Sequence, residues 1–192
     1  MERSRLSRRA IDAAVIREPA IGGIEQREIV LAQYDPSWPA LYRRHADKIG
    51  EALAETLLSI EHVGSTSVPG LAAKPIIDIV VVVRDSSDEA SYLPLLLEAG
   101  YQLRVREPDW HEHRMLRTPE LDVHVHVFSE GCSEVLRMLA FRDRMRASAE
   151  DRLRYEAVKQ ELAEMEWSDM NAYADAKSEV VEAILRNHSA VR

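Results

Sequence analysis

A Gly-Ser turn and an aspartate on the strand that follows it are the residues of this sequence best suited to chemistry. Gly64, Ser65 and Thr66 begin a loop whose backbone amides could hold phosphate oxygens, with Gly64 letting a ligand approach the chain closely. Asp78 lies in the apolar segment of residues 75–83 and could hold a divalent cation that bridges those phosphates. We therefore expect a combined phosphate and metal site between the turn and the strand.

A structural role for Asp78 is the alternative. Its carboxylate could be a core group capped by backbone amides, or it could form an ion pair with Lys74. Because an unpaired buried carboxylate costs several kcal/mol, a charged residue in a buried strand usually has a task. We therefore expect Asp78 to bind metal and take part in catalysis, and Lys74 to balance the charge of the bound phosphates.

A row of ionisable side chains lies on one face of the strand predicted at residues 121–128. Asp122, His124 and His126 alternate with valines and so point to the same side. Such a row could supply a further metal ligand, a general base or polar contacts to a ligand, whereas on an edge strand it would face solvent. We expect Asp122, as a metal ligand and catalytic acid, and His126, as a catalytic group, to meet Asp78.

Two basic residues fall on the apolar stripes of helices predicted in the last third of the chain. They are Arg142, in the helix at residues 132–146, and Lys177, in the helix at residues 169–187. Basic groups aimed at the sheet would form an electropositive wall suited to phosphates. The alternative is that their stems pack while their charges reach water. Lys159 borders a similar stripe in the helix between them.

These side chains need strands and helices that bring them together. Alternating and β-branched segments predict strands at residues 28–32, 58–63, 75–83, 101–106, 113–117 and 121–128. A helix is expected to begin at Pro36 with Asp35 as its cap. Apolar spacing predicts further helices at residues 89–98, 132–146, 150–164 and 169–187. The β-branched content of residues 75–83 indicates a central strand that is covered on both faces.

The chain length favours a single domain, because 192 residues can bury one substantial core. Within it we expect an N-terminal extension at residues 1–27 and an α/β core at residues 28–128. A C-terminal helical cap at residues 129–192 should pack on that core.

The amino-acid composition of the chain limits the partners that it can bind and the compartment that it suits. The chain has 33 acidic and 25 basic residues and a net charge of -8, which should repel duplex nucleic acid, although a small nucleotide could bind in a local basic pocket. Cys132 is the only cysteine, so no intrachain disulfide is expected and a reducing compartment fits. No apolar stretch is long enough to span a bilayer, so we expect a cytoplasmic protein that does not associate with membranes.

Several motifs of this sequence recur together in one known family. They occupy residues 34–39, 62–79, 125–128 and 141–143, followed by Tyr155 and Lys159. With these motifs the chain resembles the GrpB family over about residues 28–187. The resemblance implies an α/β (α+β) fold of the nucleotidyltransferase superfamily, with a mixed sheet, flanking helices and the helical cap. GrpB-like domains also occur fused to dephospho-coenzyme A kinase, which suggests a nucleotide or coenzyme A context.

The resemblance also implies which residues form the site. In the superfamily a Gly-Ser turn leads into a strand with metal-binding carboxylates, and here these are Gly64, Ser65 and Asp78. Active members usually carry a second acid where this chain has Val80. Because a two-metal site needs several carboxylates, Asp122 or His126 would have to complete a single-metal site, or the chain binds a nucleotide without reacting it.

Three hypotheses about function follow. The first is metal-assisted transfer of a nucleotidyl or phosphoryl group from a nucleoside triphosphate to an unknown acceptor, with Mg²⁺ or Mn²⁺ as the cation. In that reaction Lys74, Arg142 and Lys177 would balance the phosphate charge. The second is a non-catalytic, nucleotide-binding or anion-binding regulatory module. The third is a structural role in which the cap helices or the N-terminal extension form a homodimer.

Overall fold

The computed structural model describes Ile21, residues 30–165, Trp167 and residues 176–189. The N-terminal extension expected at residues 1–27 lies outside the described residues except for Ile21, as does the beginning of the helix expected at residues 169–187. The strand expected at residues 28–32 is described only in part. There Ala32 forms a single antiparallel bridge with Ala73.

Among the described residues, a five-stranded mixed sheet forms the middle layer of the fold. Its strands are β1 (Ser59–Val63), β2 (Ile77–Val83), β3 (Gln102–Glu107), β4 (His113–Arg117) and β5 (Val123–Ser129). They lie in the order β1-β2-β5-β4-β3, with β2 and β5 parallel and the other neighbours antiparallel. The central place predicted for residues 75–83 is confirmed, because β2 pairs along both of its edges.

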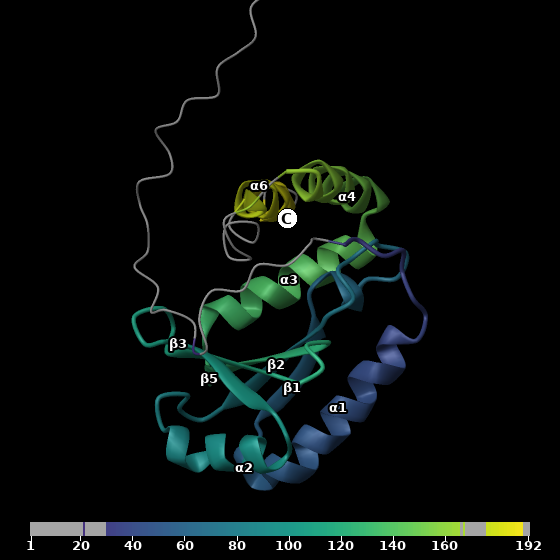
Figure 1. Ribbon diagram of the computed structural model, residues 1–192. Coiled ribbons are helices and arrows are strands. Elements are labelled where there is room, and N and C mark those ends of the chain that lie inside the picture. The colour runs from purple at the N-terminus through teal and green to yellow at the C-terminus, as the bar shows by residue number, and fades with distance from the viewer. Residues whose placement is uncertain (1–20, 22–29, 166, 168–175, 190–192) are drawn as a thin grey trace, which may run out of the picture.

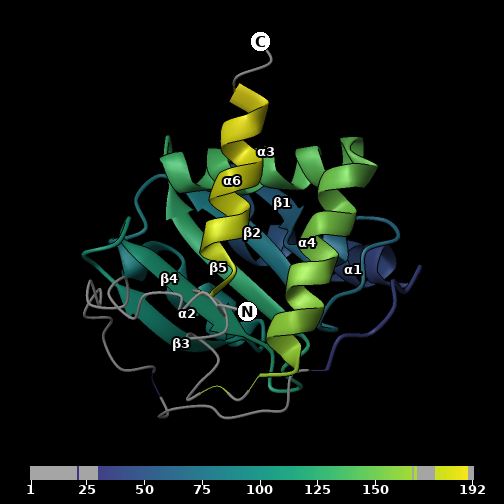
Figure 2. The ribbon, with the colours of Figure 1, turned by 90° about the horizontal axis from the view of Figure 1, so that it is seen from above.

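Helices cover both faces of this sheet. The helical elements are α1 (Trp38–Leu53), η1 (Ala54–Thr56), η2 (Ser65–Ser67), η3 (Glu89–Ser91), α2 (Leu93–Glu98), α3 (Ser133–Ala147), α4 (Ala149–Ala163) and α6 (Ser178–Ser189). Figure 1 shows α1 and α2 on one side of the sheet and α3, α4 and α6 on the other. In Figure 2, α4 and α6 run side by side and cross the direction of α3. The mixed α/β fold with flanking helices is therefore confirmed, and α3, α4 and α6 form the cap.

Two helix predictions were wrong in detail, both beside a proline. Helix α1 begins at Trp38, later than predicted, because the Asp35 carboxylate accepts the Ser37 amide at 2.7 Å and closes a turn before the helix. The helix predicted at residues 89–98 is split into η3 and α2. Pro94 stands in the first turn of α2, where its missing amide costs nothing, but it could not continue a helix that had started earlier.

The two faces of the sheet differ in chemistry. On the α1 and α2 face, the odd-numbered residues of β2 and β5 join a large apolar core. On the cap face, the even-numbered residues of the same strands include Asp78, His124 and His126. Val80 lies on this second face and is fully buried with Val63 and other apolar residues. The cap therefore covers a surface that is partly apolar and partly ionisable.

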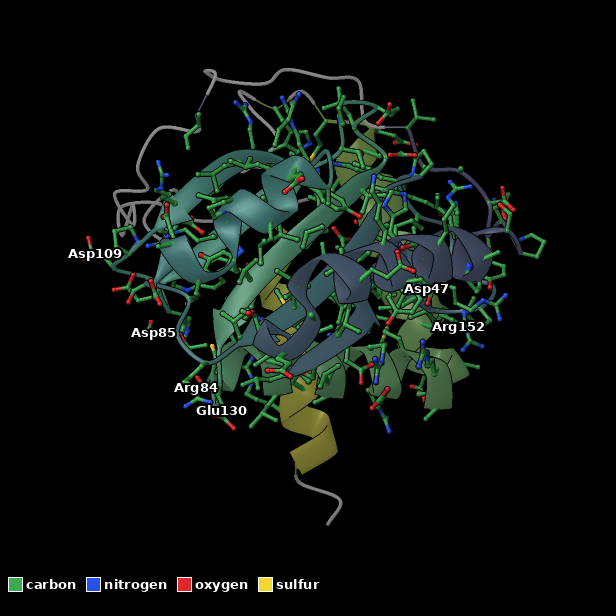
Figure 3. All side chains as sticks on the ribbon, turned by 90° about the horizontal axis from the view of Figure 1, so that it is seen from below. Asp47, Arg84, Asp85, Asp109, Glu130 and Arg152 are labelled. Atoms are coloured by element: carbon green, nitrogen blue, oxygen red, sulfur yellow. The ribbon has the colours of Figure 1, made fainter. Side chains whose placement is uncertain are left out.

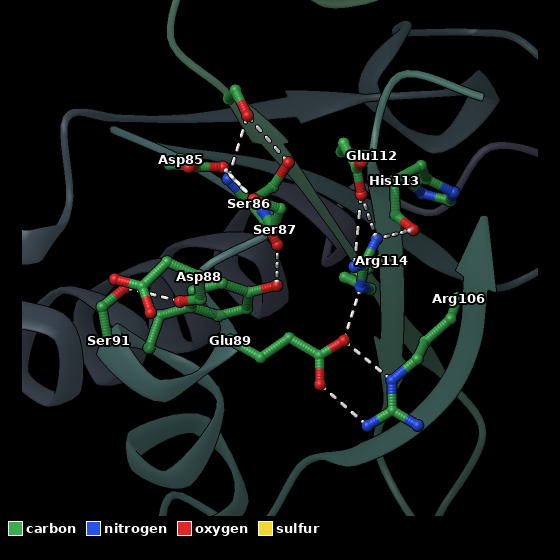
Figure 4. A network of polar contacts seen from close by, with 12 residues as sticks. Asp85, Ser86, Ser87, Asp88, Glu89, Ser91, Arg106, Glu112, His113 and Arg114 are labelled. Carbon is green, nitrogen blue, oxygen red and sulfur yellow. Dashed lines mark hydrogen bonds and ion pairs between the residues drawn. The ribbon is translucent and has the colours of Figure 1, made fainter. Parts of the chain in front are cut away.

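A polar network stabilises the part of the sheet formed by β3 and β4, at the edge opposite β1. Figure 4 shows the Glu89 carboxylate between two arginines. It accepts hydrogen bonds from Arg106 at 2.7 and 2.8 Å and from Arg114 at 2.6 Å. These bonds connect η3 to β3 and β4, so they hold the strand that begins with His113.

Within the described part of the chain, none of the helices has the length and apolar composition needed to cross a membrane.

Candidate functional site

Asp78, His124 and His126 converge on the sheet face that the cap covers. The register places His124 opposite Asp78, and the alternation of β5 puts His126 on the same face. His124 Nδ1 lies 3.5 Å and His126 Nε2 3.6 Å from Asp78 Oδ1. One ligand atom from each residue lies within 4.8 Å of the other two. We call this group the metal triad, because its spacing and donor types suit one cation.

The charge state of Asp78 fits a metal ligand. Burial opposes ionisation of this carboxyl, but hydrogen bonds and positive charge from His124 and His126 outweigh it and hold its pKa below the ordinary value. The three side chains stay between 18 and 30% exposed, so a ligand can reach them. The carboxylate is thus ionised at neutral pH, as metal binding requires.

The Asp122 carboxylate binds Thr118 and does not join the metal triad. It accepts a hydrogen bond from the Thr118 hydroxyl at 2.7 Å, and it lies outside the metal triad. The reason is local, because Leu121 has a positive φ of 66° and β5 begins only at Val123. The alternation of β5 therefore does not extend to Asp122. His124 occupies the place that we expected Asp122 to fill.

A chain of hydrogen bonds leads away from the metal triad through His126. His126 Nδ1 lies 3.1 Å from His113 Nε2, and His113 Nδ1 lies 2.7 Å from Glu107 Oε2. Burial lowers the pKa of His113 to about 4, so its ring is neutral. If it donates to Glu107, it accepts from His126 Nδ1, which orients His126 Nε2 toward Asp78 and leaves that nitrogen to bind a cation once it is deprotonated.

The sequence alone did not reveal the roles of Glu107 and His113. They lie on β3 and β4, and only the pairing of β3, β4 and β5 brings them to His126. The local signal was a histidine at the start of a predicted strand. Its pairing partners could not be read from that position alone.

The Gly64 turn passes close to Asp78 of the metal triad. Gly64 has a φ of +67°, and a Cβ at this position would lie 2.3 Å from Asp78 Oδ2. A side chain here would therefore meet the carboxylate and also strain the backbone. Only glycine allows the loop and Asp78 to approach so closely.

The amides at the start of this turn can serve a ligand. Those of Ser67 and Val68 donate to carbonyl oxygens within the loop at 3.3 and 3.2 Å. Those of Ser65 and Thr66 donate to no atom of the described residues. The Thr66 hydroxyl instead donates to the Ile76 carbonyl at 3.1 Å and holds the loop against β2. The two expected phosphate donors Ser65 and Thr66 thus directly follow Gly64, the residue that lies against Asp78.

Lys159 reaches the same turn from the cap. Its side chain is 2% exposed, and its ammonium group donates to Ser65 Oγ at 3.2 Å and to the Ala72 carbonyl. Burial and, after it, the charge of Lys177 lower its pKa to about 7. The sequence showed Lys159 only as a lysine beside an apolar stripe, whereas the structure places it against Ser65. We call the turn of Gly64, Ser65 and Thr66 the phosphate turn, after the role that we expected for it.

Lys74 and Lys177 belong to the same electropositive region. The pKa of Lys74 falls to about 8, through burial first and then through repulsion by Lys177, while Asp78 opposes the shift. Lys177 therefore lies close enough to act on both Lys74 and Lys159. We call Lys74, Lys159 and Lys177 the lysine cluster.

Arg142 lies in a different group from the lysine cluster. It donates to Glu61 Oε2 at 2.7 Å, to the His62 carbonyl at 3.1 Å and to Asp143 Oδ1 at 2.7 Å. Its side chain is 11% exposed, so the charge does not reach out into water. Arg142 is thus held at the edge strand β1.

Replacing Lys159 by methionine tests how much the burial of the Lys159 ammonium group costs in stability. Because folding lowers the pKa of Lys159 from 10.5 to about 7, the unfolded chain binds more protons between these values. The free energy of unfolding of the wild type should therefore rise with pH across this range. In Lys159→Met that rise should be smaller by roughly 1–4 kcal/mol.

Urea unfolding at a series of pH values measures this difference. Lys48 is an exposed lysine on α1, so Lys48→Met should keep the wild-type pH dependence. The same pH dependence in Lys159→Met and wild type would show that Lys159 is not desolvated.

Fold and site together define a mixed α/β protein with a histidine and carboxylate group below a glycine turn, next to a lysine cluster. The chain belongs to the GrpB family. The family model, described as GrpB protein, matches residues 28–187.

Known proteins similar to this chain agree with that assignment. A UPF0157 protein of Halalkalibacterium halodurans is 50% identical over 177 residues, which cover 91% of both chains. The crystal structure of conserved protein GrpB from Enterococcus faecalis is 30% identical, with a TM-score of 0.72, and the match covers 83% of this chain and 99% of that one. A protein of Mycolicibacterium paratuberculosis named dephospho-CoA kinase is 28% identical over 80% of this chain, but over only 44% of its own length.

Proposed function

We propose that this chain is a metal-dependent enzyme that transfers a nucleotidyl or phosphoryl group. One observation carries the proposal: Gly64 lies against Asp78, so the phosphate turn and the metal triad share a boundary. A Gly-Ser turn that leads into a strand with a metal-binding acid supports a nucleotidyltransferase-like site. The relative named dephospho-CoA kinase supports a phosphoryl-transfer context.

The donor set favours a transition metal over Mg²⁺. We expected Mg²⁺ or Mn²⁺ held by two carboxylates, but the triad offers one carboxylate and two imidazoles. Imidazole suits Zn²⁺ and other transition metals, whereas Mg²⁺ prefers oxygen ligands. We therefore propose Zn²⁺ or Mn²⁺, held by Asp78, His124 and His126. The bound cation would act as a Lewis acid on a phosphate oxygen.

The lysine cluster supplies the positive charge that a second cation would otherwise bring. With Val80 in the place of a second acid, the triad has one carboxylate and suits one cation. Lys159 lies beside Ser65 and is repelled by Lys177, so positive charge gathers next to the turn. Ser65 and Thr66 amides and these ammonium groups would bind and orient the phosphates of a nucleoside triphosphate.

A non-catalytic binding module is the second candidate. Val80 is fully buried among apolar side chains, so the usual position of a second acid belongs to the core. A chain of this kind would keep the phosphate turn and the lysine cluster but would carry out no transfer.

Binding and turnover assays separate the two candidates. The chain is stripped with EDTA, reloaded with Zn²⁺ or Mn²⁺, and titrated with nucleoside triphosphates in a calorimeter. We expect binding that depends on the metal, and transfer of label from α- or γ-labelled triphosphate to a component of an acceptor pool. Binding without pyrophosphate release or labelled product would favour the module. No binding at millimolar nucleotide with either metal would remove both candidates.

His113 provides a test of how His126 is positioned. Because His113 fixes the ring of His126, His113→Phe should lower the affinity for Zn²⁺ about 10–100-fold. Competition with a chelator of known affinity measures the change. His45 bonds to the Tyr101 hydroxyl on the α1 face, so His45→Phe is a matched control that should keep the affinity. Equal affinities in all three chains would exclude a positioning role.

A further inference from the structure

A cavity of about 750 Å³ lies at the edge strand β1, between α1, the loop that follows Gly64 and the part of the cap where α3 ends and α4 begins. Six of the described residues that line it are arginines and tyrosines: Tyr34, Tyr42, Arg43, Arg142, Arg146 and Arg152. Figure 3 shows Arg152 at the side of the molecule where α1 and the cap helices meet. A cavity of this volume can hold a small organic ligand, because such sites commonly measure about 300–1,000 Å³.

Part of the guanidinium charge in this cavity is not neutralised by a carboxylate of the described residues. Arg146 donates to the Ser67 carbonyl at 2.9 and 3.1 Å, and Arg152 donates to the Met145 carbonyl at 2.9 Å. A carbonyl orients a guanidinium group without cancelling its charge. Arg43 is exposed and makes no hydrogen bond to another described residue.

Two carboxylates offset part of the charge. Arg142 pairs with Glu61 and Asp143, both at 2.7 Å. Arg146 also lies 3.8 Å from Asp143, so these two arginines share one acid. Repulsion acts between them, since burial and then the charge of Arg142 lower the pKa of Arg146. Four guanidinium groups around two carboxylates leave an excess of positive charge, which suits phosphate oxygens.

Flat side chains line the same cavity. The Tyr42 ring stacks on His62, with centroids 4.7 Å apart and an interplanar angle of 10°. Burial lowers the pKa of His62 to about 4, so this imidazole is neutral. Tyr34 packs edge-on against Trp38 at 5.4 Å. These rings are held in place and offer an apolar surface to the organic part of a ligand.

We propose that this arginine cavity binds a small phosphorylated organic molecule, separately from the metal triad and the lysine cluster. The inference rests on the contacts of the cavity and does not depend on the proposed transfer reaction. The cavity is nevertheless connected to the candidate active site, because His62 Nε2 lies 3.1 Å from Thr66 Oγ1 in the phosphate turn. A ligand in the cavity would therefore contact residues that hold the turn.

Titration of the full chain with inorganic pyrophosphate tests this site. The calorimetric titration is run in EDTA at constant ionic strength, so that metal-dependent binding at the triad is removed. We expect the wild type to bind and the double variant Arg146→Gln, Arg152→Gln to bind at least about 10-fold more weakly. Arg154 is exposed on the same helix as Arg152 but does not line the cavity, so Arg154→Gln should keep wild-type affinity.

A third variant keeps the test valid if the double variant fails to fold. Arg43→Gln removes no hydrogen bond between described residues, and it should weaken pyrophosphate binding several-fold. Absence of binding by the wild type, or wild-type affinity in Arg43→Gln and in a folded double variant, would overturn the inference. Loss of binding in Lys159→Met alone would place the anion at the phosphate turn, which would overturn this inference and leave the proposed function intact.

Discussion

Asp78→Asn is expected to lower the affinity of the chain for Zn²⁺ or Mn²⁺ by more than about 100-fold and to abolish metal-dependent transfer. Asparagine keeps the size of the side chain but removes the one negative charge of the metal triad. The two imidazoles would then bind the cation without a counter-charge. Metal affinity is measured by competition with a chelator, and transfer by release of labelled product.

Asp122→Asn is the matched control for this experiment. Asp122 is the other acid that the sequence pointed to, but in the structure its carboxylate accepts a hydrogen bond from Thr118. The variant should therefore bind metal like the wild type. If Asp122→Asn lost the metal and Asp78→Asn kept it, the triad would not be the metal site.

Gly64→Ala is expected to reduce the free energy of unfolding by roughly 2–5 kcal/mol. A non-glycine residue at its φ of +67° and ψ of -176°, a combination essentially restricted to glycine, costs about 1–3 kcal/mol, and the contact of the new methyl group with Asp78 adds about 1–2 kcal/mol. The carboxylate must also move, so metal binding should weaken as well. Urea unfolding measures the first effect and chelator competition the second.

A variant at Gly70 separates the backbone strain from the contact with Asp78. Gly70 lies in the same loop with a φ of +78°, and a Cβ there would meet nothing within 4 Å. Gly70→Ala should therefore cost only the backbone strain, about 1–2 kcal/mol, and should leave metal binding unchanged. Equal losses of stability in the two variants would mean that Gly64 is required for its backbone conformation and not for the approach to Asp78.

Much of the fold could be predicted because its signals are local. The alternation and β-branched content of β2 and β5, and the apolar spacing of α3 and α4, depend on neighbouring residues only. The predictions failed where two local signals competed. At α1, Pro36 and Pro39 both suit a helix start, and the Asp35 carboxylate decides between them by binding the Ser37 amide.

The site was predictable to a smaller extent. Gly64 and Asp78 stand out by residue type and by the segments that carry them, and the structure places them in contact. The choice between Asp122 and His124 depended on the backbone at Leu121, whose positive φ no periodicity reveals. The position of His113 depended on strands far apart in the sequence.

The sequence by itself determined the mixed α/β class, the membership in the GrpB family and the pairing of a glycine turn with a strand acid. These features follow from residue type and from contacts between near neighbours. Only the tertiary structure decided which groups meet: His124 and His126 at Asp78, Lys159 at Ser65, and Arg142 at the edge strand. The strand order and the docking of the cap bring these residues together, and both depend on packing between segments that are distant along the chain.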